Sequence, residues 1–106
     1  VSGLIATERI VIEEVSLRGG VLSCRIYVRN IGKTAIIINN VIISSPDGSP
    51  HIYSKPNFST DFNSVVQGDL MTITIQNLGF SPDLGKTYTV KVFTSRGVGD
   101  TYQIVA

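Results

Sequence analysis

Tyr-Val-Arg-Asn-Ile-Gly at residues 27–32 and Leu-Gly-Lys-Thr-Tyr-Thr-Val-Lys-Val at residues 84–92 are the stretches that decide the fold. The first predicts a strand that runs into a turn, because side chains alternate and a glycine follows. The second predicts a turn that leads into a strand through Tyr88. In β-sandwiches a tyrosine at this place commonly hydrogen-bonds back to the preceding loop. Together the two stretches favour an immunoglobulin-like β-sandwich.

The same two-residue alternation recurs along the chain, and no segment carries the 3.6-residue period of an amphipathic helix. The 106 residues suffice for one core, so we predict a single all-β domain over residues 1–106. It contains about seven antiparallel strands, and a barrel is the weaker alternative. The expected strands cover residues 7–17, 21–30, 35–45, 65–76, 87–95 and 101–105, and the polar stretch 44–64 holds two short strands or a long loop.

Local features refine this pattern. A phase slip at Glu13 and Glu14 predicts a β-bulge or a break. Cys24 is the only cysteine, so no intramolecular disulfide can form. We interpret it as a small buried side chain rather than a reactive thiol, because free cysteines are usually buried. The residues expected to face inward from three strands are Leu22, Cys24, Ile26 and Val28; Met71, Ile73 and Ile75; and Tyr88, Val90 and Val92.

Residues 35–45 are apolar on both faces. We expect Ile36, Ile38 and Ile42 on one face and Ile37, Val41 and Ile43 on the other, although Asn39-Asn40 could form a bulge that resets the phase. A strand that is apolar on both sides is either covered twice or available to a partner. This predicts a protein interface at Ile37, Val41 and Ile43.

A second candidate interface lies on the outer face of residues 21–30. Arg25, Tyr27 and Arg29 share that face, and Tyr and Arg are favoured in binding hot spots. The alternative is a solvated face whose aliphatic stems cover the sheet.

Composition and motifs argue against other functions. A net charge of +1, from 9 basic and 8 acidic residues, gives no basic field for nucleic acid. The single histidine, His51, lies near Ser49, Ser54 and Asp47, but sequence proximity alone does not make a catalytic triad. We therefore expect no enzyme activity, no cofactor and no metal, with calcium at loop aspartates as a weak alternative. Asn57-Phe58-Ser59 fits the N-glycosylation pattern, so Asn57 is a candidate glycosylation site if the protein is exported.

Two parts of the chain resemble archaeal type IV pilin-like envelope proteins. Residues 27–44 have their strand, Asn-x-Gly turn and apolar strand, and residues 84–106 resemble their C-terminal hairpin. Within this superfamily the compact size is most similar to the archaellum stator and accessory proteins FlaF and FlaG. The resemblance does not separate FlaF from FlaG.

This resemblance implies a domain in the pseudo-periplasm of the cell envelope, anchored by an N-terminal membrane helix upstream of this chain. It implies binding to the surface layer or to a partner stator subunit, which holds the motor stationary. A homo-oligomer is also compatible with it. The close alternative is a structural subunit of a pilus-like filament. A third is a carbohydrate-binding module, whose platform would come from Tyr27, Tyr53, Phe58 and Tyr102.

Overall fold

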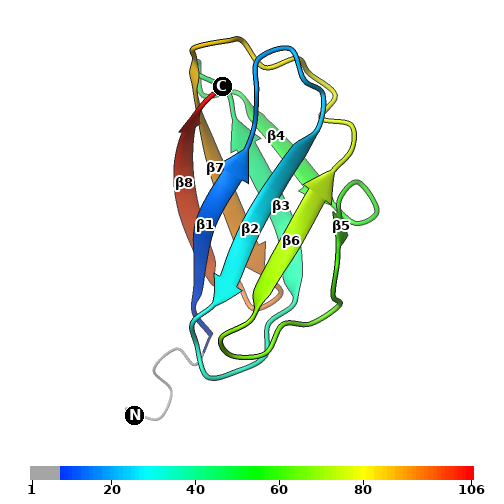
Figure 1. The fold of residues 1–106 in the computed structure, drawn as a ribbon, viewed down its shortest axis with the longest axis vertical. Coiled ribbons are helices and arrows are strands. Elements are labelled where there is room, and N and C mark those ends of the chain that lie inside the picture. The colour runs from blue at the N-terminus through cyan, green and yellow to red at the C-terminus, as the bar shows by residue number, and fades with distance from the viewer. Residues whose placement is uncertain (1–7) are drawn as a thin grey trace.

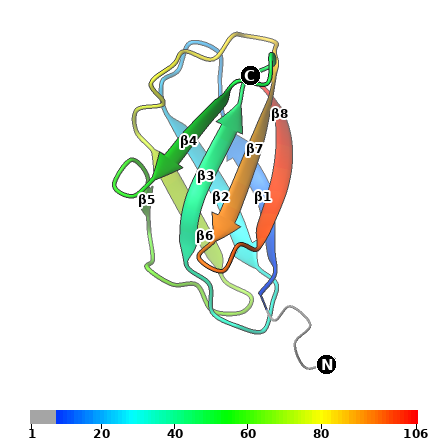
Figure 2. The same ribbon diagram turned by 180° about the vertical axis from the view of Figure 1, so that it is seen from behind.

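The computed structural model describes residues 8–106, which form two four-stranded antiparallel sheets packed as a sandwich (Figure 1, and from behind in Figure 2). The first sheet has the spatial order β1-β2-β6-β5, with β1 (Ile10–Ser16), β2 (Cys24–Asn30), β6 (Leu70–Ile75) and β5 (Ser59–Thr60). The second has the order β4-β3-β7-β8, with β4 (Pro50–Ser54), β3 (Ile38–Ser44), β7 (Thr87–Thr94) and β8 (Gly99–Val105).

This strand order is that of the immunoglobulin sandwich, and it confirms the predicted fold class. Such domains pair strands A, B, E and D in one sheet and C, F and G in the other. Here β4 adds a strand beside β3. The structure has eight strands where about seven were expected, because the polar stretch 44–64 contributes both β4 and the two-residue β5.

Two β-bulges set which side chains face inward. In β1 the register against β2 shifts between Ile12 and Glu14, which confirms the predicted slip. In β3 the register against β7 shifts between Ile38 and Asn40. Because one extra residue reverses the alternation, Ile38 points inward before the second bulge and Val41 points inward after it.

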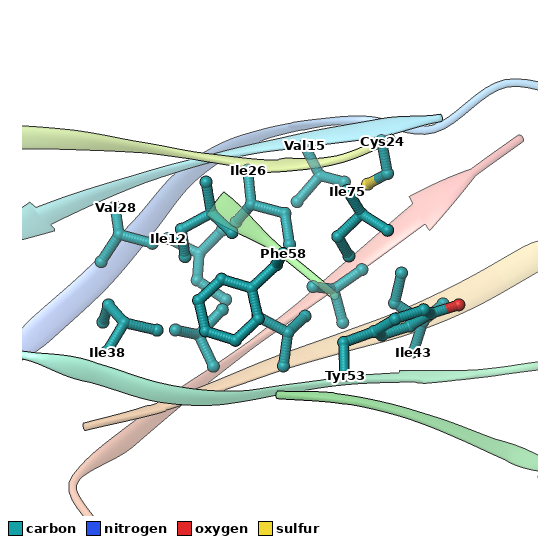
Figure 3. Close-up of a cluster of buried hydrophobic side chains, with 14 of the residues drawn as sticks. Ile12, Val15, Cys24, Ile26, Val28, Ile38, Ile43, Tyr53, Phe58 and Ile75 are labelled. Atoms are coloured by element: carbon teal, nitrogen blue, oxygen red, sulfur yellow. The ribbon is translucent and has the colours of Figure 1, made fainter. Parts of the chain in front are cut away.

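The core lies between the two sheets and is built from their inward side chains (Figure 3). Cys24 is 2% exposed, as predicted, and burial raises the pKa of its thiol to about 12. Leu22 is a correction: it is 51% exposed, because β2 begins only at Cys24. The other predicted inward residues are buried, namely Ile26, Val28, Met71, Ile73, Ile75, Tyr88, Val90 and Val92.

Tyr88 forms the predicted tyrosine corner at the start of β7. Its side chain is buried, and its hydroxyl accepts a hydrogen bond of 2.8 Å from the backbone N–H of Asp83. The bond ties the loop before β7 to the strand itself, as this corner does in other immunoglobulin-like sandwiches. Tyr88 therefore stabilises the position of residues 83–87.

Asn30, at the end of β2, joins the turn after β2 to two other segments. Its side chain is fully buried; the amide NH₂ donates to the carbonyls of Thr34 and Val65 at 2.9 and 2.8 Å. Its Oδ1 accepts from the N–H of Gly32 at 2.9 Å. The Asn-x-Gly sequence thus forms an Asx-type turn, whose NH₂ group also reaches the chain before β6.

Candidate interaction surface

The isoleucine-rich strand is the first candidate interface, but the structure exposes only one of the three residues predicted for it. Val41 and Ile43 are fully buried, which contradicts the expectation that they offer a surface. The cause is the bulge in β3, which turns both side chains toward the core. Ile37, by contrast, is 48% exposed.

The same bulge turns Ile42 outward and creates a different apolar surface on the second sheet. Ile42 pairs directly with Ile52 of β4, whose side chain is 65% exposed. Phe93 of β7 pairs with Asn40, one position from the bulge and on the same outer face as Ile42. Since diagonal neighbours on a sheet are about 7–8 Å apart, an aromatic ring at this place reaches Ile42.

Ile37 continues this surface toward the end of β7. Its carbonyl accepts a hydrogen bond of 2.8 Å from the N–H of Ser95, two residues beyond Phe93. We call the resulting outer surface of the second sheet, formed by Ile37, Ile42, Ile52 and Phe93, the isoleucine face. Lys91 pairs with Ile42 and gives the face one positive charge.

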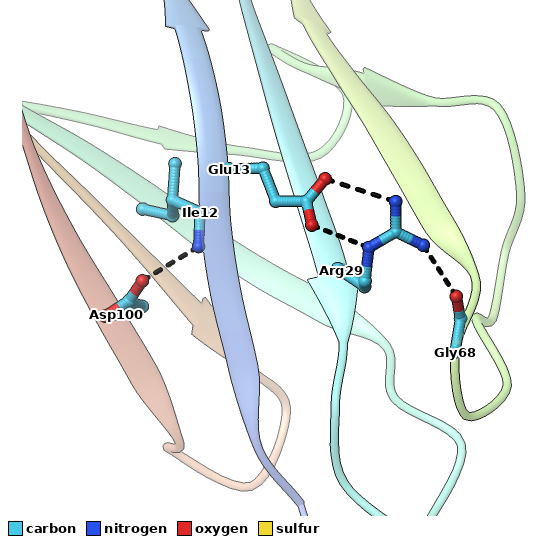
Figure 4. A network of polar contacts seen from close by, with 5 residues as sticks. All are labelled: Ile12, Glu13, Arg29, Gly68 and Asp100. Atoms are coloured by element: carbon cyan, nitrogen blue, oxygen red, sulfur yellow. Dashed lines mark hydrogen bonds and ion pairs between the residues drawn. The ribbon is translucent and has the colours of Figure 1, made fainter.

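Arg25, Tyr27 and Arg29 lie together on the outer face of the first sheet, as the alternation predicted. Figure 4 shows that Arg29 is already engaged: its guanidinium contacts both carboxylate oxygens of Glu13, at 2.6 and 3.2 Å. It also donates to the carbonyl of Gly68 at 2.7 Å. The guanidinium holds the pKa of the Glu13 carboxyl below its ordinary value. A paired, solvated face is a poorer apolar anchor than the isoleucine face.

The outer edges of the sheets differ in how open they are to another strand. On β1, the backbone N–H of Ile12 donates to the carboxylate of Asp100 in β8 at 2.8 Å (Figure 4). This carboxylate occupies a donor that a partner strand would need. On the first sheet's other edge, β5 is only two residues long. The second sheet, which carries the isoleucine face, ends in the five-residue β4 with Ile52 on one side and in the seven-residue β8 on the other.

The residues considered for catalysis and metal binding form neither a catalytic triad nor a metal-ligand group within residues 8–106. His51 Nε2 lies 3.0 Å from Ser45 Oγ, not from Ser49 or Ser54. Among the described residues, no carboxylate hydrogen-bonds to the other ring nitrogen, which a triad requires. Within residues 8–106 no group of three or more His, Cys, Asp or Glu side chains is arranged to hold a metal ion.

The aromatic residues considered for a carbohydrate platform do not form one. Tyr53 and Phe58 belong to the core, with exposed fractions of 6% and 3%. The Tyr53 hydroxyl donates to the carbonyl of Leu78 at 2.6 Å, which explains its inward position. Tyr27 lies on the first sheet and Tyr102 on the second, so they cannot act together.

Asn57, the candidate glycosylation site, is exposed in the turn after β4. Its backbone N–H donates to the carbonyl of Ser54 at 2.7 Å, so the turn is held while the side chain stays accessible. Among residues 8–106, no helix is long and apolar enough to cross a membrane.

Comparison with known proteins identifies relatives in structure. No family model matches the sequence, and no curated protein matches it. The archaellum periplasmic stator protein FlaG from Sulfolobus acidocaldarius superposes with a TM-score of 0.76 at 21% identity, over 92% of this chain and 99% of that one. A chain of the FlaF and FlaG stator complex from the same organism gives 0.74 at 21% identity, over 95% and 90%. The resemblance predicted from residues 27–44 and 84–106 is confirmed at the level of the fold: the chain has the fold of the archaellum stator proteins.

Proposed function

We propose that this chain is the non-enzymatic interaction domain of an archaellum stator protein and that it binds a partner stator subunit through the isoleucine face. The observation that carries the proposal is an exposed apolar surface on a domain with the stator fold. A solved structure with this fold is described as a complex of FlaF and FlaG, which supports a stator subunit as the partner.

The chemistry of the isoleucine face suits such a partner. Ile52 and Ile37 are large apolar side chains that water still reaches, and burying each in an interface contributes about 1.5–3 kcal/mol at full burial. Because Ile52 is 65% exposed, burying the rest of its side chain contributes about 1–2 kcal/mol. Each 1.4 kcal/mol is tenfold in affinity, so Ile52 alone accounts for roughly a 10-fold effect. Lys91 would pair with an acidic residue at the edge of the contact.

Anchoring and location follow as parts of the same proposal. A membrane helix upstream of this chain would lie on the side of the domain where β1 begins, at the lower end in Figure 1. The sandwich would then project from the outer surface of the cell membrane into the pseudo-periplasm. The opposite end, which carries the turn between β3 and β4, would point toward a surface layer, the second proposed partner.

The proposal also includes glycosylation of Asn57, because this modification requires export and the proposed location lies outside the cell membrane. Asn57 is exposed and follows the edge strand β4 by three residues. Mass spectrometry of protein from the native host would show the added hexose mass on the peptide that contains Asn57, and its absence there would remove this part of the proposal.

The test is co-purification from envelope extract of the native host, with the wild-type domain and two variants. Ile52→Glu places a charge on the isoleucine face, whereas Val66→Glu changes a β-branched residue of similar exposure, 56%, outside it. Recovery of a second stator-type sandwich protein by the wild type and by Val66→Glu, and its loss with Ile52→Glu, supports the proposal. Equal recovery by all three refutes the assignment of the face.

The alternative of a filament subunit is tested by light scattering of the purified domain. A mass that grows with concentration and is insensitive to envelope extract would favour self-assembly. A constant monomer mass, together with capture of a stator subunit, favours the stator role.

A further inference from the structure

The outer edge of β8 is a seven-residue strand edge that no other strand of residues 8–106 covers. Figures 1 and 2 both show β8 at the margin of the second sheet, beside β7. The other sheet edges are protected: β1 by its bulge and by Asp100, β5 by its two-residue length, and β4 by Pro50, which has no N–H. By contrast, β8 contains neither proline nor lysine, and its register against β7 is unbroken.

The hydrogen bonds at the two ends of β8 show which of its backbone groups point outward. The Thr94 N–H donates to the carbonyl of Val98 at 2.8 Å. The Ala106 N–H donates to the carbonyl of Lys86 at 2.9 Å. Because bonded residues alternate along an antiparallel strand, the even-numbered residues between these two also face β7. The backbone N–H and C=O groups that point away from the sheet, and that no hydrogen bond engages within residues 8–106, belong to Gly99, Thr101, Gln103 and Val105.

The side chains of these four residues lie on the outer face of the second sheet, where they are exposed and uncharged. Asp100, the one charged residue of β8, lies on the opposite face with its carboxylate bound to β1. At one end of the edge, a Cβ on Gly99 would lie 2.6 Å from Cδ1 of Phe93, so this ring rests against the glycine. At the other end, Val105 is 60% exposed.

We propose that β8 pairs with β8 of a second copy of this chain, in antiparallel orientation and centred on Tyr102. The whole strand then overlaps: Thr101 lies opposite Gln103 of the second copy, and Gly99 lies opposite its Val105. Each of these pairs joins two residues whose backbone groups point outward, so each exchanges two hydrogen bonds.

Two contacts make this register self-complementary. Val105 of one copy lies beside the glycine of the other and reaches the Phe93 ring across it, which buries an exposed apolar side chain at each end. The two Tyr102 residues face each other at the two-fold axis, in a non-hydrogen-bonded pair with a Cα separation of about 4.5 Å. Aromatic pairs at such positions stabilise a sheet. A symmetric pairing centred on Thr101 or Gln103 would lose both contacts.

The pairing closes at two copies, because the same edge is used on both sides of a two-fold axis. The axis is perpendicular to the second sheet, so the two isoleucine faces lie on the same side of the joined sheet. The starts of β1 lie at opposite ends of the dimer, so the upright arrangement proposed above is that of an unpaired domain. A filament subunit, in contrast, would continue to add copies.

The experiment is sedimentation equilibrium of the domain. A strand-edge contact is a small interface, so we expect a Kd on the order of 100 µM and a mass that levels off at two chains. Thr101→Lys should weaken pairing at least tenfold, because it places two lysines about 7–8 Å apart across the pair. Thr87→Lys makes the same change on the outer face of β7, away from the edge, and should leave pairing unchanged.

The register is tested by cross-linking with oxidised glutathione. Tyr102→Cys should form a disulfide-linked dimer, because the Cα separation of the central pair is within disulfide reach. Gln103→Cys, which lies opposite Thr101, should cross-link more slowly, and Cys24 is only 2% exposed and does not interfere. If Tyr102→Cys does not fold, Thr101→Lys still decides the question.

Several outcomes would overturn the inference. These are a monomer up to about 1 mM, ten times the expected Kd, equal pairing by wild type and Thr101→Lys, a mass that grows beyond two chains, or faster cross-linking of Gln103→Cys than of Tyr102→Cys. The inference is independent of the proposed stator contact. Ile52→Glu should leave pairing unchanged, and Thr101→Lys should leave binding of the stator partner unchanged, so failure of one proposal is distinguishable from failure of the other.

Discussion

Replacing Asn30 by alanine tests how the turn after β2 is held. The substitution removes three side-chain hydrogen bonds, to Gly32, Thr34 and Val65. At about 1 kcal/mol each, their loss costs about 3 kcal/mol. The cost is not larger, because two of the abandoned groups keep other partners: Gly32 N–H bonds to Arg9, and the Val65 carbonyl accepts from Ile36.

A loss of about 3 kcal/mol is a large part of the 5–15 kcal/mol that stabilises a typical domain. In urea, with a slope near 2 kcal/mol/M, it shifts the unfolding midpoint down by about 1.5 M. Asn39→Ala is the matched control, since Asn39 is exposed and hydrogen-bonds through its side chain to Asn40 alone among residues 8–106. We expect the control to change stability by less than about 0.5 kcal/mol. Equal midpoints for the two variants would refute the role assigned to Asn30.

Three further predictions concern the core. Tyr88→Phe removes the acceptor for Asp83 N–H and should lower the free energy of unfolding by about 0.5–1.5 kcal/mol in urea denaturation; an unchanged value would mean that water replaces the bond without cost. Ile43→Ala, at a buried position, should lower the free energy of unfolding by about 2–5 kcal/mol, and Ile52→Ala, at an exposed one, by less than about 0.5 kcal/mol. A larger loss for Ile52→Ala than for Ile43→Ala would contradict the assigned inner face of β3. The Cys24 thiol, whose pKa burial raises to about 12, should resist a thiol reagent at pH 8 until the protein is unfolded. Because this folded-state pKa exceeds the reference value of 9.0, the free energy of unfolding should fall as the pH rises from 9 toward 12.

Features set by local alternation could be predicted from the sequence. The inward residues of β6 and β7 follow from a regular two-residue period, and Tyr88 follows from its place after a corner. The fold class follows from these strands and their spacing. None of these features depends on knowing which strands are neighbours.

The isoleucine face could not be assigned in the same way. Whether Asn39 resets the phase depends on the pairing of β3 with β7, which begins more than forty residues later. The sequence marks the two asparagines as a place for a bulge but does not say whether one forms. Ile52 and Phe93 were missed as surface residues, because their neighbours become visible only when the sheet is assembled.

Long-range packing also explains the remaining differences between the sequence-based predictions and the structure. Tyr53 and Phe58 lie in a polar stretch, yet both enter the core; the Tyr53 hydroxyl bonds to Leu78 across the sandwich. His51 lies in β4 and Phe80 in the loop before β7, and only the folded chain stacks their rings. A histidine after a proline and a phenylalanine after a glycine carry no signal that they meet.

The measurement that tests the central claim most directly is the affinity of the domain for a purified partner stator subunit from its own host. We would compare wild type, Ile52→Glu and Val66→Glu by isothermal titration calorimetry, after confirming that all three have the same urea midpoint. Our account predicts that Ile52→Glu weakens binding by roughly 10-fold or more and that Val66→Glu stays within about 2-fold of wild type. Equal affinities for the wild type and Ile52→Glu would contradict it.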